Sequence, residues 1–278
     1  ITAPTTITAT YDTYYLVQYA ANVPVTLPAN EWVKSGQAAI GIFSSPQYNA
    51  AGDTKYVFVS DNRPATITAP TTITATYDTY YWVTYAANVP VTVPSDEWVL
   101  SGEAATGVFV SPQYNPTGDT KYVFVSDDRP LTITAPTTIT ATYKIQYKLT
   151  VNTDPSGLTP APSIDPTSPD GFYDAGAKVT LIANTVSGYT FNYWTVDGTS
   201  QGSGKDKIEV TMSAPHSAVA FYAPFTMSGY FTDSDWNLID FREIDLYPGD
   251  MEDVQVEWTP TIVPMPAEVG LLTIHGCI

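Results

Sequence analysis

Few residues of this chain could carry out catalysis, and they do not form a catalytic motif. There are two histidines, His216 in an Ala-Pro-His turn and His275 near the carboxyl end. A serine or cysteine nucleophile needs a base held beside it, and no serine, histidine and aspartate pattern of that kind is visible. The single cysteine, Cys277, cannot form an intrachain disulfide, although a bridge between subunits stays open. We therefore expect no enzymatic activity, no catalytic residue and no cofactor.

Closely spaced carboxylates are the second group with chemical potential. They occur as Asp233 with Asp235, and as Asp250, Glu252 and Asp253. Calcium takes several oxygen ligands from flexible loops, but neither group has EF-hand spacing, so we interpret both as solvated acidic turns and expect no metal site. Hydrolysis of a glycoside needs two carboxylates that face one sugar in a cleft, and no insertion is large enough to build one.

Lysines and tryptophans at repeated positions suggest a covalent or a binding role. Lys55 and Lys121 are equivalent strand-edge residues beside aromatics. An intramolecular isopeptide bond there is an alternative that we do not favour; a mass deficit of one ammonia or water per domain would reveal it. Trp32, Trp98 and Trp194 could stack on a sugar, but Trp32 and Trp98 are one position in two copies of a repeat, which favours packing.

The composition excludes several classes of partner. The formal net charge is −17, and the 11 lysines and arginines are scattered singly. Without a basic stripe to neutralise phosphates, we expect the chain to bind neither nucleic acid nor an anionic membrane surface. No segment resembles a membrane span or a signal peptide. A chain that opens in strand-like sequence suits a secreted protein whose leader has been removed, or a piece cut from a longer one.

The elements that position these residues are predicted to be β-strands. The 20 Tyr, 10 Phe and 6 Trp stand among many Thr and Val, which favour strands, while 23 Pro and 17 Gly interrupt the chain too often for long helices. No stretch shows helical periodicity. The predicted fold class is therefore all-β.

A repeat organises the first half of the chain. The sequence ITAPTTITATY occurs at residues 1–11, 67–77 and 133–143, a period of 66 residues (67 − 1 and 133 − 67). Short apolar runs alternate with turns, which predicts tandem small β-sandwich or immunoglobulin-like domains strung end to end. The strands predicted in the second copy are Tyr80–Tyr85, Pro90–Val93, Ala104–Val110, Tyr122–Val125, Leu131–Thr134 and Thr138–Tyr143.

The third period keeps this frame with a different sequence. It contains YKLTV at 147–151, GAKVTL at 176–181, GYTFNYW at 188–194 and a closing segment MSAPHSAVAFY at 212–222. This pattern resembles the divergent InlB B-repeat family of bacterial and archaeal surface repeats over residues 143–222, and the first two periods resemble it only weakly. The resemblance implies an extracellular, cell-surface protein of stalk or adhesin type without enzymatic activity.

The repeat also sets the domain boundaries. With ITAPTTITATY as the closing strand, the domains are residues 11–77, 78–143 and 144–222, preceded by residues 1–10 and followed by residues 223–278. The last segment, with its Leu-x-Pro-Gly-Asp turn, resembles the later strands of a CARDB-type immunoglobulin-like domain. Such a domain needs about seven strands and roughly a hundred residues, so the segment is predicted to be incomplete.

A closing strand without a domain at one end and an incomplete domain at the other predict head-to-tail assembly. We expect the first residues of one copy to add a strand to the last domain of the next, which makes identical subunits the partners and a filament the product. This layout resembles archaeal-type surface filament subunits that donate a strand. The donated residues are Ile1, Thr2, Thr6, Ile7, Thr8, Ala9 and Tyr11, and the acceptor residues are Tyr230, Ile244, Leu246, Val254, Val256, Trp258, Leu272 and Ile274.

Two alternatives stay open. In one, the chain is cut from a longer tandem array and residues 1–10 are a dangling strand. In the other, it forms the stalk of a cell-surface adhesin or an S-layer-associated protein that binds a surface or a glycan.

Overall fold

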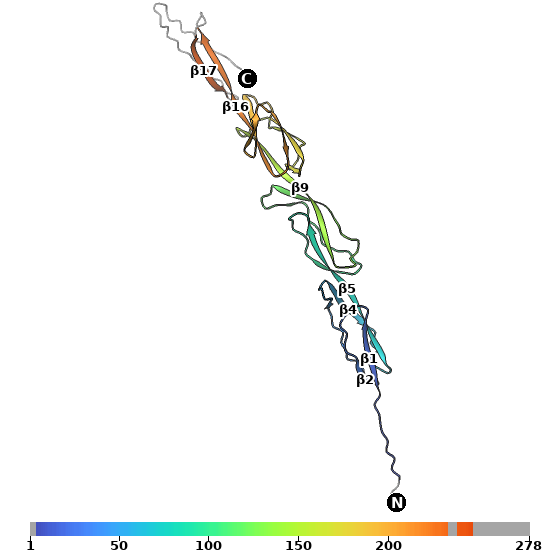
Figure 1. The fold of residues 1–278 in the computed structure, drawn as a ribbon. Coiled ribbons are helices and arrows are strands. Elements are labelled where there is room, and N and C mark those ends of the chain that lie inside the picture. Colours follow the sequence, from blue (N-terminus) through green and yellow to red (C-terminus); the bar gives the residue numbers. More distant parts are fainter. Residues whose placement is uncertain (1–3, 233–237, 247–278) are drawn as a thin grey trace, which may run out of the picture. The chain divides into compact units, whose positions relative to one another are not determined.

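The computed structural model describes residues 4–232 and 238–246, and its side chains are described for residues 4–224. Every regular element in this part of the chain is a β-strand (Figure 1), which confirms the all-β prediction. The described residues thus include no helix that is long and apolar enough to span a membrane.

The chain divides into two compact units. The first comprises residues 1–113 and 122–143, and the second comprises residues 114–121 and 144–278.

Five strands build the first repeat of the first unit. They are β1 (Tyr14–Ala21), β2 (Glu31–Lys34), β3 (Gln47–Tyr48), β4 (Thr54–Asp61) and the first part of β5 (Thr71–Ala87). They lie in the order β2-β1-β5-β4-β3, and β5 runs parallel to β1 and antiparallel to β4. The closing strand therefore occupies the centre of the sheet and not its edge.

The second repeat has the same strand order. It contains the last part of β5, β6 (Glu97–Leu100), β7 (Gln113–Tyr114), β8 (Thr120–Asp127) and the first part of β9 (Thr137–Asp154). Because β5 is one continuous strand of 17 residues, its first part closes one repeat and its last part opens the next (Figure 1).

The strands form because apolar residues alternate with threonines. In β5, Ile73, Ala75 and Tyr77 are buried, while Thr72 and Thr76 are exposed. This two-residue period is that of a strand with one face in a core. The other buried residues of the first repeat's core are Val17, Tyr19, Val33, Ala39, Phe43, Tyr56 and Ile67.

In the second unit, two sheets enclose the core of the third repeat. One sheet holds the last part of β9, β11 (Phe172–Asp174), β13 (Tyr189–Val196), β14 (Thr199–Ser203) and the first part of β16 (His216–Thr232), and the other holds β10 (Ser163–Asp165), β12 (Lys178–Ile182) and β15 (Lys207–Thr211). Trp194 on the first sheet and Leu181 on the second are both fully buried in one cluster. This repeat is therefore a sandwich. Beyond it, the last part of β16 pairs antiparallel with β17 (Leu238–Leu246).

Three predicted strands of the second repeat are not strands, namely Pro90–Val93, Ala104–Val110 and Leu131–Thr134. Residues 104–110 still alternate, since Ala105 and Phe109 are buried and Val108 is exposed. Their backbone is held by side chains in place of a neighbouring strand. The prediction was wrong because a two-residue period does not reveal what lies beside an extended segment.

Candidate assembly site

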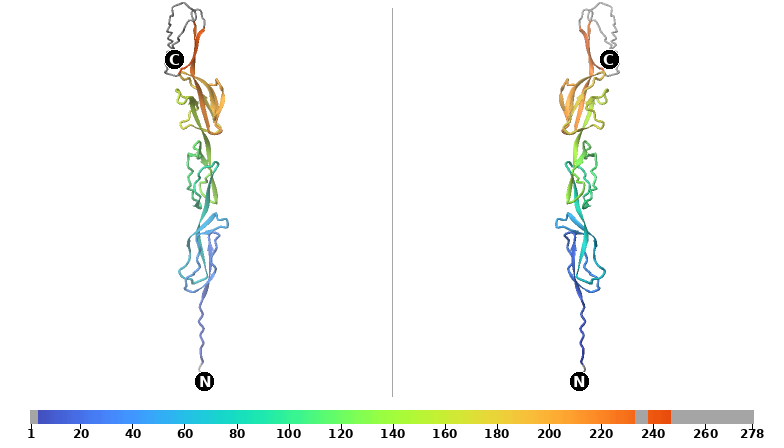
Figure 2. Two further views of the ribbon diagram at one scale, coloured as in Figure 1. Left: turned by 90° about the vertical axis from the view of Figure 1, so that its left-hand side faces the viewer. Right: turned by 90° about the vertical axis from the view of Figure 1, so that its right-hand side faces the viewer.

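Residues 4–11 lie before the first strand and belong to no sheet. Every one of them is exposed, and Ile7 and Tyr11 are 92% and 86% exposed. Both views in Figure 2 show this segment leaving β1 with no other part of the first unit beside it. Ile1 and Thr2, which were predicted to belong to the same strand, lie outside the described residues.

The same sequence forms buried strands elsewhere in the molecule. The equivalents of Ile7 are Ile73 and Ile139, and both are 0% exposed. The two equivalents of Tyr11 are 3% and 2% exposed. Since the eleven residues are identical in all three copies, the exposure of the first copy does not come from a difference in its own sequence.

Alternation gives the segment an apolar face and a polar face. Ile7, Ala9 and Tyr11 share one face, and their equivalents in β5 and β9 are all buried. Thr6 lies on the other face, because its equivalents Thr72 and Thr138 are exposed. Full burial of one large aliphatic side chain contributes roughly 1.5–3 kcal/mol, so the apolar face has a substantial drive to leave water.

The predicted acceptor residues fall only partly within the described structure. Tyr230 lies on β16, and Ile244 and Leu246 lie on β17, which is paired with β16. The structure therefore brings these three residues onto two adjacent strands. The other five, Val254, Val256, Trp258, Leu272 and Ile274, lie outside the described residues.

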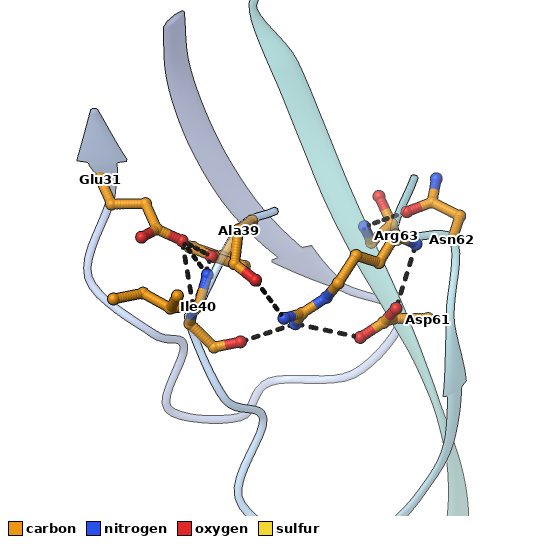
Figure 3. Close-up of polar contacts among 9 residues, drawn as sticks. Glu31, Ala39, Ile40, Asp61, Asn62 and Arg63 are labelled. Atoms are coloured by element: carbon orange, nitrogen blue, oxygen red, sulfur yellow. Dashed lines mark hydrogen bonds and ion pairs between the residues drawn. The ribbon is translucent and has the colours of Figure 1, made fainter. Parts of the chain in front are cut away.

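Each of the first two repeats also contains a polar clamp, which we define as Glu31, Asp61 and Arg63 in the first repeat (Figure 3). The N–H groups of Ile40 and Gly41 donate to Glu31 Oε1 at 2.9 and 3.1 Å. From the other side, Arg63 donates to the carbonyl oxygens of residues 39 and 41 at 3.0 and 2.6 Å. Asp61 lies 3.3 Å from the same guanidinium group.

A tyrosine and a glycine complete this arrangement. The Tyr19 hydroxyl donates to Glu31 and accepts the N–H of Gly41 at 3.0 Å. A Cβ atom on Gly41 would lie 2.3 Å from the Tyr19 ring, so this position requires glycine. The second repeat has the same contacts through Tyr85, Glu97, Gly107, Asp127 and Arg129. Sequence reasoning missed the clamp, although all five residues recur at the 66-residue period.

The hydrogen bonds of the clamp keep its glutamates ionised. Burial alone would raise the pKa of Glu97, but hydrogen bonds from Thr106, Tyr85 and the backbone N–H groups of residues 106 and 107 lower this pKa to about 2. The same kinds of hydrogen bond outweigh burial and lower the pKa of Glu31. Because the clamp occupies backbone groups of an extended segment, it hinders that segment from pairing with a foreign strand.

Lys55 and Trp98 lie where the first repeat meets the second. Lys55 Nζ is 4.8 Å from the ring centroids of both Tyr80 and Trp98, and the Tyr48 ring is 5.8 Å from Trp98. Trp98 is thus a packing residue, as predicted. For Trp32 the packing prediction was wrong, because this side chain is 68% exposed.

Trp194 and Lys121 have structural surroundings too. Trp194 is fully buried, and its Nε1–H donates to the Asp206 carbonyl at 3.2 Å, so it is no stacking platform. Lys121 Nζ lies 2.6 Å from an Asp170 carboxylate oxygen. The hydrogen bond from Lys121 is the main cause that lowers the pKa of Asp170 to about 2. An ionised carboxylate resists nucleophilic attack, so the geometry supports an ion pair and not an isopeptide bond.

The remaining candidates for chemistry do not gather into a site. His216 Nδ1 lies 2.6 Å from Asp197 Oδ2 at the start of β16. Among the described residues, no group of three or more His, Cys, Asp or Glu side chains is placed to hold a metal ion. The other candidates lie outside the described residues, namely Asp233, Asp235, Asp250, Glu252, Asp253, His275 and Cys277.

Known proteins resemble parts of this chain. Residues 147–227 match the family model of the divergent InlB B-repeat domain, which confirms the resemblance found in the third period. The chain is also similar to a solved structure of Streptococcal High Identity Repeats in Tandem (SHIRT) domains 3-4 from a cell surface protein. That likeness has 18% identity and a TM-score of 0.19, and it covers 47% of this chain and 98% of the other. No curated protein matches the chain.

Proposed function

We propose that this chain is a structural subunit of an extracellular cell-surface filament, polymerised head-to-tail by strand donation. Residues 1–11 of one copy complete the domain at residues 223–278 of the next copy. The partners are therefore identical subunits, and the chain has no enzymatic role.

One observation carries this proposal. A segment whose apolar face is buried in two repeats is exposed throughout residues 4–11 in its first occurrence, where Ile7 is 92% exposed against 0% for Ile73. Its backbone is already suited to strand pairing, because in β5 residues 71–75 of the same sequence pair parallel with β1 and the residues from Ala75 onwards pair antiparallel with β4. A second copy with an unfilled groove is a partner of matching chemistry.

The match of residues 147–227 to the divergent InlB B-repeat domain supports a surface location, since the resemblance implies stalk-like surface proteins. The clamps also suit a filament subunit. Each clamp occupies backbone groups of an extended segment in its repeat, which favours association through the donated strand over lateral pairing.

A pair of substitutions on opposite faces of the segment tests the proposal. Ile7→Asp puts a charge on the face that enters the groove, where burial of an unpaired carboxylate is strongly unfavourable. Thr6→Asp puts the same charge on the face that stays in water. We expect filaments by electron microscopy from the wild type and from Thr6→Asp, and sedimentation as a monomer for Ile7→Asp. Filaments of normal length from Ile7→Asp, or from a chain without residues 1–10, would refute strand donation.

The exposed indole of Trp32 favours a second candidate, the stalk of an adhesin or S-layer-associated protein that binds a glycan. Binding of the wild-type monomer to immobilised glycans, with loss of binding in Trp32→Ala, would support this function. Such binding in a chain that never polymerises would replace the filament proposal.

A further inference from the structure

The last described strands open a fourth domain in the register of the three repeats. Each ITAPTTITATY sequence ends in a tyrosine, at position 11, 77 or 143. In each repeat, the pairing of the first strand with the second begins at the third residue after this tyrosine (14 − 11, 80 − 77 and 146 − 143). The pairs are Tyr14 with Lys34, Tyr80 with Leu100, and Gln146 with Asp174. After Tyr222 the third residue is Phe225, and it pairs with Leu246 of β17. The last part of β16 and β17 are thus the first two strands of a fourth domain.

A closing strand also has a fixed register in every repeat. It lies parallel to the first strand, and its first paired residue faces the sixth residue after the tyrosine (17 − 11, 83 − 77 and 149 − 143). The pairs are Val17 with Thr71, Val83 with Thr137, and Leu149 with His216. In the fourth domain the sixth residue is Ser228 (222 + 6). Among the residues described, this part of β16 pairs with β17 on one edge, and no parallel strand lies along the other edge of the same part.

We propose that the edge of β16 at residues 228–232 binds residues 5–9 of a second copy as a parallel strand, with Thr5 opposite Ser228. This inference rests on the proposed function and names the place and register of the contact. Thr5 is the equivalent of Thr71 and Thr137, which open the same pairing within the chain. The register puts Ile7 opposite Tyr230, one of the predicted acceptor residues.

The occupant is a second copy because the donated sequence already fills this position twice. Residues 67–77 and 133–143 are identical to residues 1–11, and both close a sheet beside a first strand. Within the first unit the closing strand also continues without a break into the next repeat. The joint between two subunits therefore has the same backbone pairing as the joint between two repeats.

A cysteine pair tests this register in the full-length chain. The test variant carries Thr6→Cys and Gly229→Cys together in a Cys277→Ser background. These two positions lie opposite each other in the proposed pairing. Neighbouring strands lie about 4.8 Å apart, which is within reach of a disulfide. Thr6 is on the polar face, so its substitution leaves the apolar face intact. We expect oxidised filaments to give a ladder of covalent multimers in a denaturing gel without reductant.

The matched control combines Thr6→Cys with Thr226→Cys, three residues out of register. This shift separates the two positions by about 10 Å, beyond the reach of a disulfide, so we expect no ladder. A ladder from the control pair that equals or exceeds that of the test pair overturns the register. A disulfide within single chains overturns the second copy as the occupant. If Ile7→Asp abolishes filaments but neither cysteine pair cross-links them, strand donation stands and the site at β16 is wrong.

Discussion

At the scale of single residues, the polar clamp supplies the backbone hydrogen bonds that a neighbouring strand would supply in a regular sheet. Buried backbone groups must be paired, and here a glutamate accepts from two N–H groups while an arginine donates to two carbonyls. Hydrogen bonds with a charged partner are stronger than neutral ones, which suits an edge that has no ladder. The tyrosine beside Glu31 and Glu97 links each clamp to the repeat's core.

The clamp predicts an acid-sensitive part of the stability. The pKa of Glu97 is about 2 in the folded chain, below its ordinary value of about 4.3. The stabilisation is therefore complete above about pH 5 and is lost as the pH falls from there towards 2. We expect Glu97→Gln to lower the melting temperature at pH 6 and to flatten its decline between pH 5 and 2. Thermal unfolding followed by circular dichroism measures this.

The control for this prediction is Glu103→Gln, which removes an exposed carboxylate outside the clamp. Its melting temperature should follow that of the wild type at every pH. If both variants decline as steeply as the wild type below pH 5, the clamp is not the source of the acid sensitivity.

At the scale of elements, one aromatic position organises the contact between successive repeats. Trp98 on β6 lies opposite Trp82, and its ring contacts Lys55 and Tyr48 of the first repeat. In the second unit, Phe172 on β11 lies opposite Lys148, and its ring is 5.5 Å from Lys121 and 5.8 Å from Tyr114. The backbone N–H of Trp82 donates to the Asp53 carbonyl at 2.9 Å, and the backbone N–H of Lys148 donates to the Asp119 carbonyl at the same distance.

Trp98 and Trp32 allow this contact to be measured with an internal control. Trp98→Ala removes a partly buried ring and a cation–π partner, so we expect a loss of about 2–3 kcal/mol, less than the 3–5 kcal/mol of a fully buried aromatic residue. Trp32→Ala removes the exposed equivalent and should change stability by no more than about 0.5 kcal/mol. Urea unfolding of the two variants compares them directly. Equal losses would show that the contact between the repeats adds nothing.

The sequence predicted these elements only as far as local patterns reach. The strands expected at Tyr80–Tyr85, Tyr122–Val125 and Thr138–Tyr143 lie inside β5, β8 and β9, because apolar alternation is local. The prediction of a strand at Ala104–Val110 was wrong, because the backbone of this segment is hydrogen-bonded to side chains from distant positions and not to another strand. The different surroundings of Trp32 and Trp98 were also beyond prediction, since identical local sequence does not determine which other segments lie beside a side chain.

At the scale of the whole molecule, shared strands make the chain an assembly of repeats with a common joint. The closing part of each long strand is central in its sheet, so it cannot leave without opening the repeat's core. A donated copy of this strand would bind a second molecule with the same pairing. A filament formed in this way would therefore contain no type of contact that the chain does not already have.

Hydrogen exchange of the first segment tests strand donation most directly. Peptides that begin before residue 4 and end beyond β1 distinguish this segment from its identical copies. We predict that the amides of residues 5–9 exchange within seconds in the monomer and become as protected in filaments as those of residues 71–75 in β5. Fast exchange of residues 5–9 in both states, with the copy in β5 protected throughout, would contradict the account.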